Sequence, residues 1–300
     1  MQELAIEYYI RNFFALSEND KDNALLALSK ISEHVLEVMN VIFTQMVMRS
    51  KLFDSESFKL QRCMIQYMAG KHLAIHSFVT TKHIVSINDV PNVVYDYTPA
   101  ISIVRSMFEM LLIHHAIFVT ANTEEERTFL INIWKYKGLK FPAETTGIDT
   151  QEMQEARQVR NQFLQEIKRS PLFDENDFKA TKSNSIVYFS GEGKKRHLTS
   201  CSFTNGWKLL QETEEFRHKS TQDLYARLCT ETHVTYMGLM MYEQQNQMTP
   251  SPQLAALYLS CSLFSYMLLE IMAFNDDYKK AFEALDVIQK KIFWTFLDVL

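Results

Sequence analysis

Apolar residues recur at helical spacing along most of the chain. Between residues 20 and 48 they advance in steps of three and four, which predicts one long amphipathic helix with Asn19 or Asp20 as its N-cap. The same spacing predicts helices over residues 2–16 and 55–84. These patterns favour an all-α protein, a multi-helix bundle of about ten helices with a small loop or hairpin insert.

Later segments continue the helical pattern. Thr98-Pro99 is a good helix start, and the helix it opens, up to Thr120, is apolar nearly all round. This helix, residues 99–120, is expected at the centre of the bundle. Capping boxes predict helix starts at Thr123 with Glu126 and at Asp149 with Glu152. Helical spacing also covers residues 220–245, and two final helices are expected after the break at Thr249-Pro250-Ser251-Pro252.

Residues 171–201 interrupt the helical pattern. They combine acidic residues with the β-prone run 186–189 and a glycine turn at 191–193, so a short hairpin or loop insert is expected. We expect an N-terminal helical region over residues 1–98 and a helical core region over 99–300 that carries this insert. The alternative is that all 300 residues form a single domain.

Composition supports a folded helical protein and narrows its function. Hydrophobic residues make up 47% of the chain, and only 7 Gly and 6 Pro supply turns. The net charge of −5 argues against a protein whose whole surface binds nucleic-acid phosphates. No signal peptide precedes the first helix, and the four cysteines form no C-x-x-C pair, so we expect a cytoplasmic protein that spans no membrane.

Arg105 and Glu109 stand out because they lie four residues apart on the apolar helix that begins at Thr98. Charged groups buried in such a helix need polar partners, since an unpaired buried charge is very costly. The pair is therefore expected to be either an internal salt bridge that fixes helix packing or part of a functional pocket.

A second candidate constellation lies on the helix that begins near Ser220. Arg227 and His233 have an Arg-x5-His spacing, which resembles the motif of the helical ribonucleases called HEPN proteins. That resemblance implies that Arg227 steadies the scissile phosphate while His233 acts as acid/base in metal-independent RNA cleavage. Leu228 stands where that family usually has a polar residue, and the competing interpretation is a surface Arg with a core His.

A broader resemblance covers Pro99 to Met240. Arg105, Ser106 and Glu109, followed much later by Tyr225, Leu228 and His233, are similar to an uncharacterised bacterial all-helical family known only as a domain of unknown function. The resemblance implies that Arg105, Glu109 and His233 converge in one polar site, but it supplies no reaction.

Two further groups are weaker candidates. His72, His76 and His83 follow one stripe of the predicted helix 55–84, as zinc ligands or as partly exposed histidines. No carboxylate or cysteine completes a ligand set, so no metal site is assigned. Lys194, Lys195 and Arg196 form a basic run that either contacts RNA phosphates or is a solvated turn.

Two functions compete at this point. One is a metal-independent endoribonuclease of toxin or phage-defence type. In it His233 is the acid/base, Arg227 or Arg105 stabilises the phosphate and Glu109 orients them. The RNA-binding residues are then Lys194, Lys195, Arg196 and Tyr225. The other is a non-catalytic helical interaction or regulatory module of a bacterial defence complex. Neither needs a cofactor, and the apolar C-terminus, residues 292–297, favours a homodimer or a protein partner.

Overall fold

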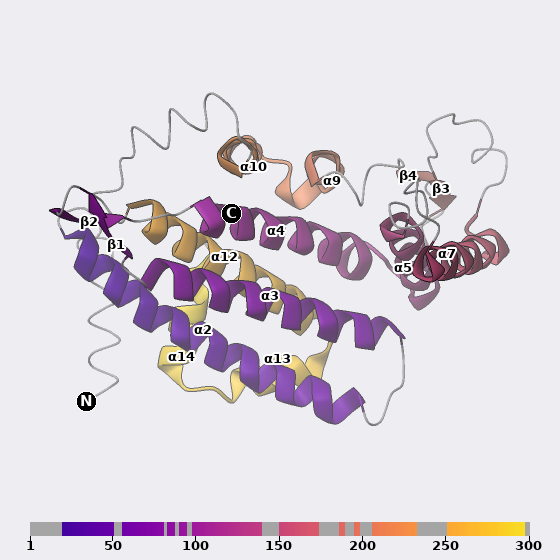
Figure 1. Cartoon of the computed structure of the whole chain (residues 1–300). Helices are drawn as coiled ribbons and strands as arrows, with labels where there is room; N and C mark the ends of the chain where they lie inside the picture. The colour runs from indigo at the N-terminus through magenta and orange to yellow at the C-terminus, as the bar shows by residue number, and fades with distance from the viewer. Residues whose placement is uncertain are drawn as a thin grey trace. The chain divides into compact units, whose positions relative to one another are not determined.

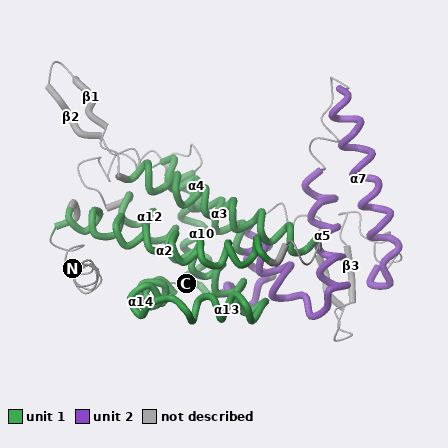
Figure 2. Tube along the Cα trace, turned by 90° about the horizontal axis from the view of Figure 1, so that it is seen from below, with its two compact units in different colours: residues 1–111, 218–300 green, residues 112–217 purple. Residues whose placement is uncertain are grey.

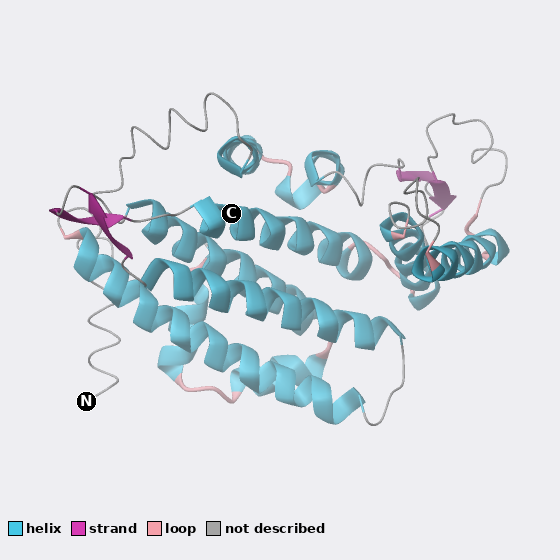
Figure 3. Ribbon diagram, viewed as in Figure 1, coloured by secondary structure: helices cyan, strands magenta, loops and turns pink. Residues whose placement is uncertain are grey.

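The computed structural model confirms the all-α, multi-helix class (Figure 1). It contains ten α-helices and two short β-hairpins within the residues that it describes. Figure 3 distinguishes these helices and strands by colour. The helix expected over residues 2–16 lies outside them. The described residues are 20–50, 56–80, 83–87, 90–94, 98–139, 150–173, 186–189, 195–198, 206–232 and 251–297.

The chain divides into two compact units (Figure 2). Unit 1 joins residues 1–111 to residues 218–300, and unit 2 consists of residues 112–217. This division differs from the boundary expected after residue 98, because helices from both ends of the chain pack together in unit 1. The helices of unit 1 are α2 (Lys21–Ser50), α3 (Glu56–Thr80), α4 (Thr98–His114, whose last three residues belong to unit 2), α10 (Lys219–Thr232), α12 (Ser251–Phe274), α13 (Asp276–Glu283) and α14 (Val287–Thr295).

Helix α12 forms the middle of unit 1, the place that the sequence suggested for residues 99–120. It packs against α2, α3 and α13, and it is apolar on every side, with Leu257, Phe264 and Leu268 fully buried. Helix α2 runs as predicted: Asp20 Oδ1 accepts a hydrogen bond from the Asn23 N–H over 3.2 Å. The apolar stripe of α2 is buried at Leu28, Ile31, Val35, Val38, Ile42 and Met46.

Two spans of helix are long and apolar enough to cross a membrane by length and composition. They are Thr98–Val119, which covers α4 and the short π-helix η1 (His115–Val119), and Gln253–Phe274 within α12. More than half of each span is buried inside the protein, as in the core helices of soluble proteins.

The C-terminal region holds three helices where two were expected. Asn275 caps α13 through the Asp277 N–H, and Asp286 caps α14 through the N–H groups of Ile288 and Gln289. These two caps divide the last 26 residues into short helices, because each places a hydrogen-bond acceptor at a new helix start. Ile292, Phe293 and Phe296 of the apolar C-terminus are buried within the chain itself, so they no longer support a dimer.

Helix α3 ends at Thr80 and not at Ile84 as predicted. The following residues form an antiparallel hairpin of β1 (His83–Ile87) and β2 (Val90–Val94), with His83 opposite Val94. The β-branched residues of this segment favour strands, and Asn88-Asp89 supplies the residue types of a two-residue hairpin loop. His83 therefore does not continue the helical stripe of His72 and His76.

The main contact within unit 2 is between two helices that pack against each other, α5 (Glu124–Gly138) and α7 (Gln151–Arg169). Two cation–π contacts join them: the Arg160 guanidinium lies 4.5 Å from the Tyr136 ring centre, and Lys135 Nζ lies 5.1 Å from that of Phe163. The expected hairpin of the insert is confirmed as β3 (Ile186–Phe189) paired with β4 (Lys195–Leu198). Helix α9 (Gly206–Glu212) and the 3-10 turn η2 (Glu214–Phe216) complete the unit.

The two predicted capping boxes have different outcomes. Thr123 accepts a hydrogen bond from the Glu126 N–H over 3.1 Å, and Glu126 Oε2 accepts one from the Asn122 N–H over 3.0 Å, so this box is confirmed with a one-residue shift of its return bond. For α7 the prediction was one residue off, because Thr150 and not Asp149 is the N-cap.

Replacing the cap of α5 gives a first test of the fold. We expect Thr123→Ala to lower the free energy of unfolding by about 1 kcal/mol, since the Glu126 N–H loses its acceptor. Thr123→Ser keeps the hydroxyl and should stay within about 0.5 kcal/mol of the wild type. Urea unfolding followed by far-UV circular dichroism measures both, and equal losses for Ala and Ser would contradict the cap.

Candidate functional site

Arg105 and Glu109 form an ion pair on the surface of α4. Arg105 Nε donates to Glu109 Oε1 over 3.1 Å, and the two side chains are 23% and 34% exposed. The pair is thus only partly buried, whereas the sequence had suggested full burial. Because water reaches both groups, their mutual attraction is weaker than that of a dry pair.

Tyr225 of α10 completes the interaction from a distant part of the chain. Its hydroxyl donates a hydrogen bond of 2.6 Å to Glu109 Oε1, the oxygen that also accepts from Arg105. The Arg105 guanidinium lies 6.0 Å from the Tyr225 ring centre, and the rings of Tyr225 and Phe108 are 5.5 Å apart. We call Arg105, Glu109 and Tyr225 the polar triad; it joins α10 to α4.

The electrostatics of the polar triad keep it in a fixed protonation state. Burial, together with the hydrogen bond to Glu109 and its negative charge, raises the pKa of the Tyr225 phenol, so Tyr225 remains a donor. Burial opposes the charge of Arg105, but the nearby acidic groups Cys229 and Glu109 outweigh it and raise the pKa of the guanidinium. Around neutral pH Arg105 is therefore a cation and Tyr225 a neutral phenol.

Cys229 is a neighbour of the triad to which the sequence alone assigned no role. It lies one turn after Tyr225 on α10, and as an acidic group close to both side chains it contributes to the raised pKa of Arg105 and of Tyr225. Its thiol is free and partly exposed. The four-residue spacing from Tyr225 was the available signal.

Arg227 does not join the polar triad. It lies two residues after Tyr225, which turns it by roughly 200° to the other side of α10. Its side chain is 60% exposed, and its Nε donates to Glu231 Oε1 over 2.7 Å. The structure thus separates Arg227 from Arg105, although the two arginines had been alternatives for the same role.

The remaining predicted site residues are not brought to the triad. His233 and Lys194 lie outside the described residues. Lys195 and Arg196 belong to β4 of unit 2, where the structure describes the backbone register, with Tyr188 opposite Arg196. An RNA contact through this basic run stays a prediction.

The histidines of α3 are bound to serines and not arranged as metal ligands. His72 is wholly buried, and its Nδ1 lies 2.9 Å from Ser260 Oγ of α12. His76 Nε2 lies 2.9 Å from Ser29 Oγ of α2. Within the described ranges no group of three His, Cys, Asp or Glu side chains is placed to hold a metal ion. The expectation of partly exposed histidines was wrong for His72.

A histidine in unit 2 makes a contact that the sequence did not predict. His115, the first residue of η1, is buried, and its Nε2 lies 2.9 Å from Glu215 Oε2 of η2. The ring of Phe216 meets it edge-on at 5.3 Å. This contact fixes η2 against the π-helix, and nothing in the sequence between His115 and Glu215, which are 100 positions apart, signals it.

Comparisons with known proteins add no family. No protein family, curated protein sequence or solved structure matches this chain. Both resemblances drawn from the sequence, to HEPN ribonucleases and to the uncharacterised helical family, therefore stay predictions. The side-chain geometry is therefore the basis for any functional proposal.

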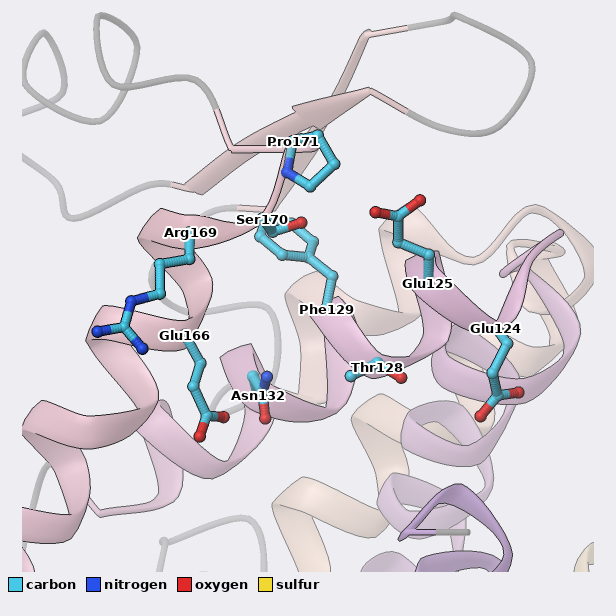
Figure 4. Close-up of a pocket in the computed structure, with 9 residues that line it drawn as sticks. All are labelled: Glu124, Glu125, Thr128, Phe129, Asn132, Glu166, Arg169, Ser170 and Pro171. Atoms are coloured by element: carbon cyan, nitrogen blue, oxygen red, sulfur yellow. The ribbon is translucent and has the colours of Figure 1, made fainter.

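Unit 2 contains an open cavity of about 500 Å³ between α5 and the end of α7 (Figure 4). Asn132 contributes a buried Oδ1 without a hydrogen-bond partner in the described part of the protein. Acidic side chains also line the cavity, but two of them interact with basic groups. Glu124 forms an ion pair with Arg127, and the charge of Glu166 favours the protonated form of Lys135. With Arg169 also in the wall, charges of both signs are present, and we assign the cavity no catalytic role.

Proposed function

We propose that the protein is a non-catalytic helical interaction module, a regulatory subunit that works in the cytoplasm. The closed polar triad carries this proposal. Glu109 Oε1 accepts hydrogen bonds from Arg105 on the same helix and from Tyr225 of α10, so the Tyr225 bond joins α10 to a carboxylate that Arg105 already pairs. A catalytic site would instead keep such groups directed at a substrate.

Exposed apolar side chains supply a surface for partners. Tyr67 and Phe78 of α3 are 38% and 43% exposed, and their separation of eleven residues puts them on one side of that helix. Exposed aromatic residues on a helix are common anchors in protein interfaces. We propose that this side of α3 mediates self-association of the chain.

A light-scattering measurement of molar mass tests self-association. The wild type is expected to have the mass of two chains, and Tyr67→Ser with Phe78→Ser that of one. Trp207→Ser removes an aromatic residue of similar exposure from α9 and serves as the control. A wild type that stays monomeric at all concentrations, or a dimer unaffected by the double change, removes the proposed surface.

The architectural role of the triad predicts a particular pattern of stabilities. Glu109→Leu alone should lower the free energy of unfolding by about 1–3 kcal/mol, because Arg105 and Tyr225 lose a charged acceptor. Replacing all three, as Arg105→Met, Glu109→Leu and Tyr225→Phe, should restore stability to within about 1 kcal/mol of the wild type, since the two donors are removed together with their shared acceptor. Urea unfolding measures both, and a triple variant less stable than the single one would contradict the role.

A metal-independent endoribonuclease remains the second candidate. Tyr225 and Cys229 are four residues apart on α10, and both are close to Arg105. In the sequence His233 follows Cys229 at the same four-residue spacing. In this nuclease model Arg105 stabilises the scissile phosphate of the RNA. Arg227 does not take part, because it lies on the other side of α10.

RNA degradation in the presence of a chelator separates the two candidates. The interaction module predicts no cleavage by the wild type beyond that of His233→Ala. The nuclease predicts cleavage that is lost in His233→Ala and in Arg105→Gln but kept in Arg227→Gln. Loss in Arg227→Gln alone would instead support the original Arg-x5-His motif.

A further inference from the structure

A cavity of about 450 Å³ opens between α12, α13 and α14 of unit 1. Its walls are mainly apolar and come from Leu269 and Met272 of α12, Phe282 of α13 and Trp294 of α14. This volume and this lining are typical of sites for small organic molecules. The cavity is separate from the polar triad and from the surface of α3, so it is independent of the proposed function.

Aromatic packing holds the apolar wall in place. The Phe282 ring lies 4.8 Å from Phe293 and 6.0 Å from Trp294, and Phe293 is fully buried. Trp294 nevertheless leaves 49% of its surface exposed. The Trp294 ring is held by its aromatic neighbours and is accessible on its free face, so it offers a preformed apolar contact for an alkyl chain.

The charged groups of the cavity are two lysines and one glutamate, Lys279, Lys290 and Glu283. Lys290 Nζ donates to the backbone carbonyl of Glu283 over 3.0 Å, which places its ammonium at the end of α13. Neither lysine pairs with a carboxylate in the part of the chain that the structure describes. The cavity therefore has an excess of positive charge beside an apolar interior.

We infer that this cavity binds a medium-chain carboxylic acid. The alkyl chain lies against Phe282 and Trp294, and the carboxylate is held by Lys279 and Lys290. An aliphatic amine would meet the two ammonium groups instead, and a neutral alcohol would gain only the apolar contact.

Trp294 is a built-in reporter for binding. The chain has 3 tryptophans, so Trp134→Phe with Trp207→Phe leaves Trp294 alone. Titration with decanoate should change its emission in a saturable way at one ligand per chain, and calorimetry on the unmodified protein should give the same affinity. Octanoate should bind about tenfold more weakly, because two methylene groups fewer are buried.

The lysines are tested by changing the head group and the protein together. Decanoate should bind about fivefold more tightly than decanol, and Lys279→Gln with Lys290→Gln should abolish that difference while leaving decanol unchanged. Lys280→Gln is the matched control, because Lys280 pairs with Asp277 and does not line the cavity. Equal affinities of decanoate and decanol for the wild type would overturn the inference.

Filling the cavity tests the location. Ala273 also lines it, and Ala273→Leu should weaken decanoate more than tenfold by occupying the space of the alkyl chain, with an unchanged urea unfolding midpoint. Unchanged decanoate binding by Ala273→Leu would mean that the fatty acid binds elsewhere, and the absence of saturable binding by the wild type would likewise refute the site.

Discussion

Phe264→Ala should lower the free energy of unfolding of unit 1 by about 3–5 kcal/mol. Phe264 is fully buried in α12, and its ring centre lies 5.7 Å from that of His72 on α3. Phe264 thus lies between α12 and α3, and the close packing of a protein interior leaves a cavity of this size only partly closed. Urea unfolding followed by circular dichroism gives the loss.

The matched control is an apolar residue of α2 that points to solvent. Leu26 is 55% exposed, so Leu26→Ala should change the free energy of unfolding by no more than about 0.5 kcal/mol. Similar losses for the two variants would mean that α12 is not the centre of the core. A loss for Phe264→Ala below about 1 kcal/mol would have the same meaning.

Acidification should destabilise the protein through His72. Burial lowers the pKa of His72 to about 4, opposed by a backbone hydrogen bond with Ser32 and assisted by the charge of His76. The ordinary value is 6.5, so between pH 6.5 and about 4 the unfolded chain binds a proton that the folded chain refuses. The free energy of unfolding should fall through that window by about 3 kcal/mol, with roughly 2 kcal/mol lost by about pH 5.

His72→Gln isolates this effect, since it removes the titrating ring and retains a polar side chain near Ser260. Its stability should lose about 2 kcal/mol less than that of the wild type between pH 7 and about pH 5. Leu26→Ala changes an exposed apolar side chain of α2 and removes no titratable group, so it should keep the wild-type slope. If both variants show the wild-type slope, His72 is not the group that titrates.

The helices were the most predictable part of the fold. Regular apolar spacing and the Asp20 cap defined α2 nearly to the residue, and the Thr123 hydroxyl marked the start of α5. The boundary of α3 failed because the helical spacing of its apolar residues runs on into a β-branched segment whose strand pairing depends on a partner. Local spacing identifies an element, but pairing decides where it ends.

The candidate site was predictable only along one helix at a time. The four-residue spacing of Arg105 and Glu109 indicated their contact directly. Tyr225 is 116 residues away from Glu109, so only the family resemblance pointed to it. His72 was misjudged because its burial depends on α12, which covers it from the far end of the sequence.

The split of unit 1 across both ends of the chain affects how the protein is made. Helices α2 and α3 leave the ribosome early, but α12, against which they pack, begins only at Ser251. At about 5–20 residues per second, roughly 10–30 s of synthesis separate them. During that interval the nascent chain carries uncovered apolar faces, so this protein is expected to engage chaperones while it is still being translated.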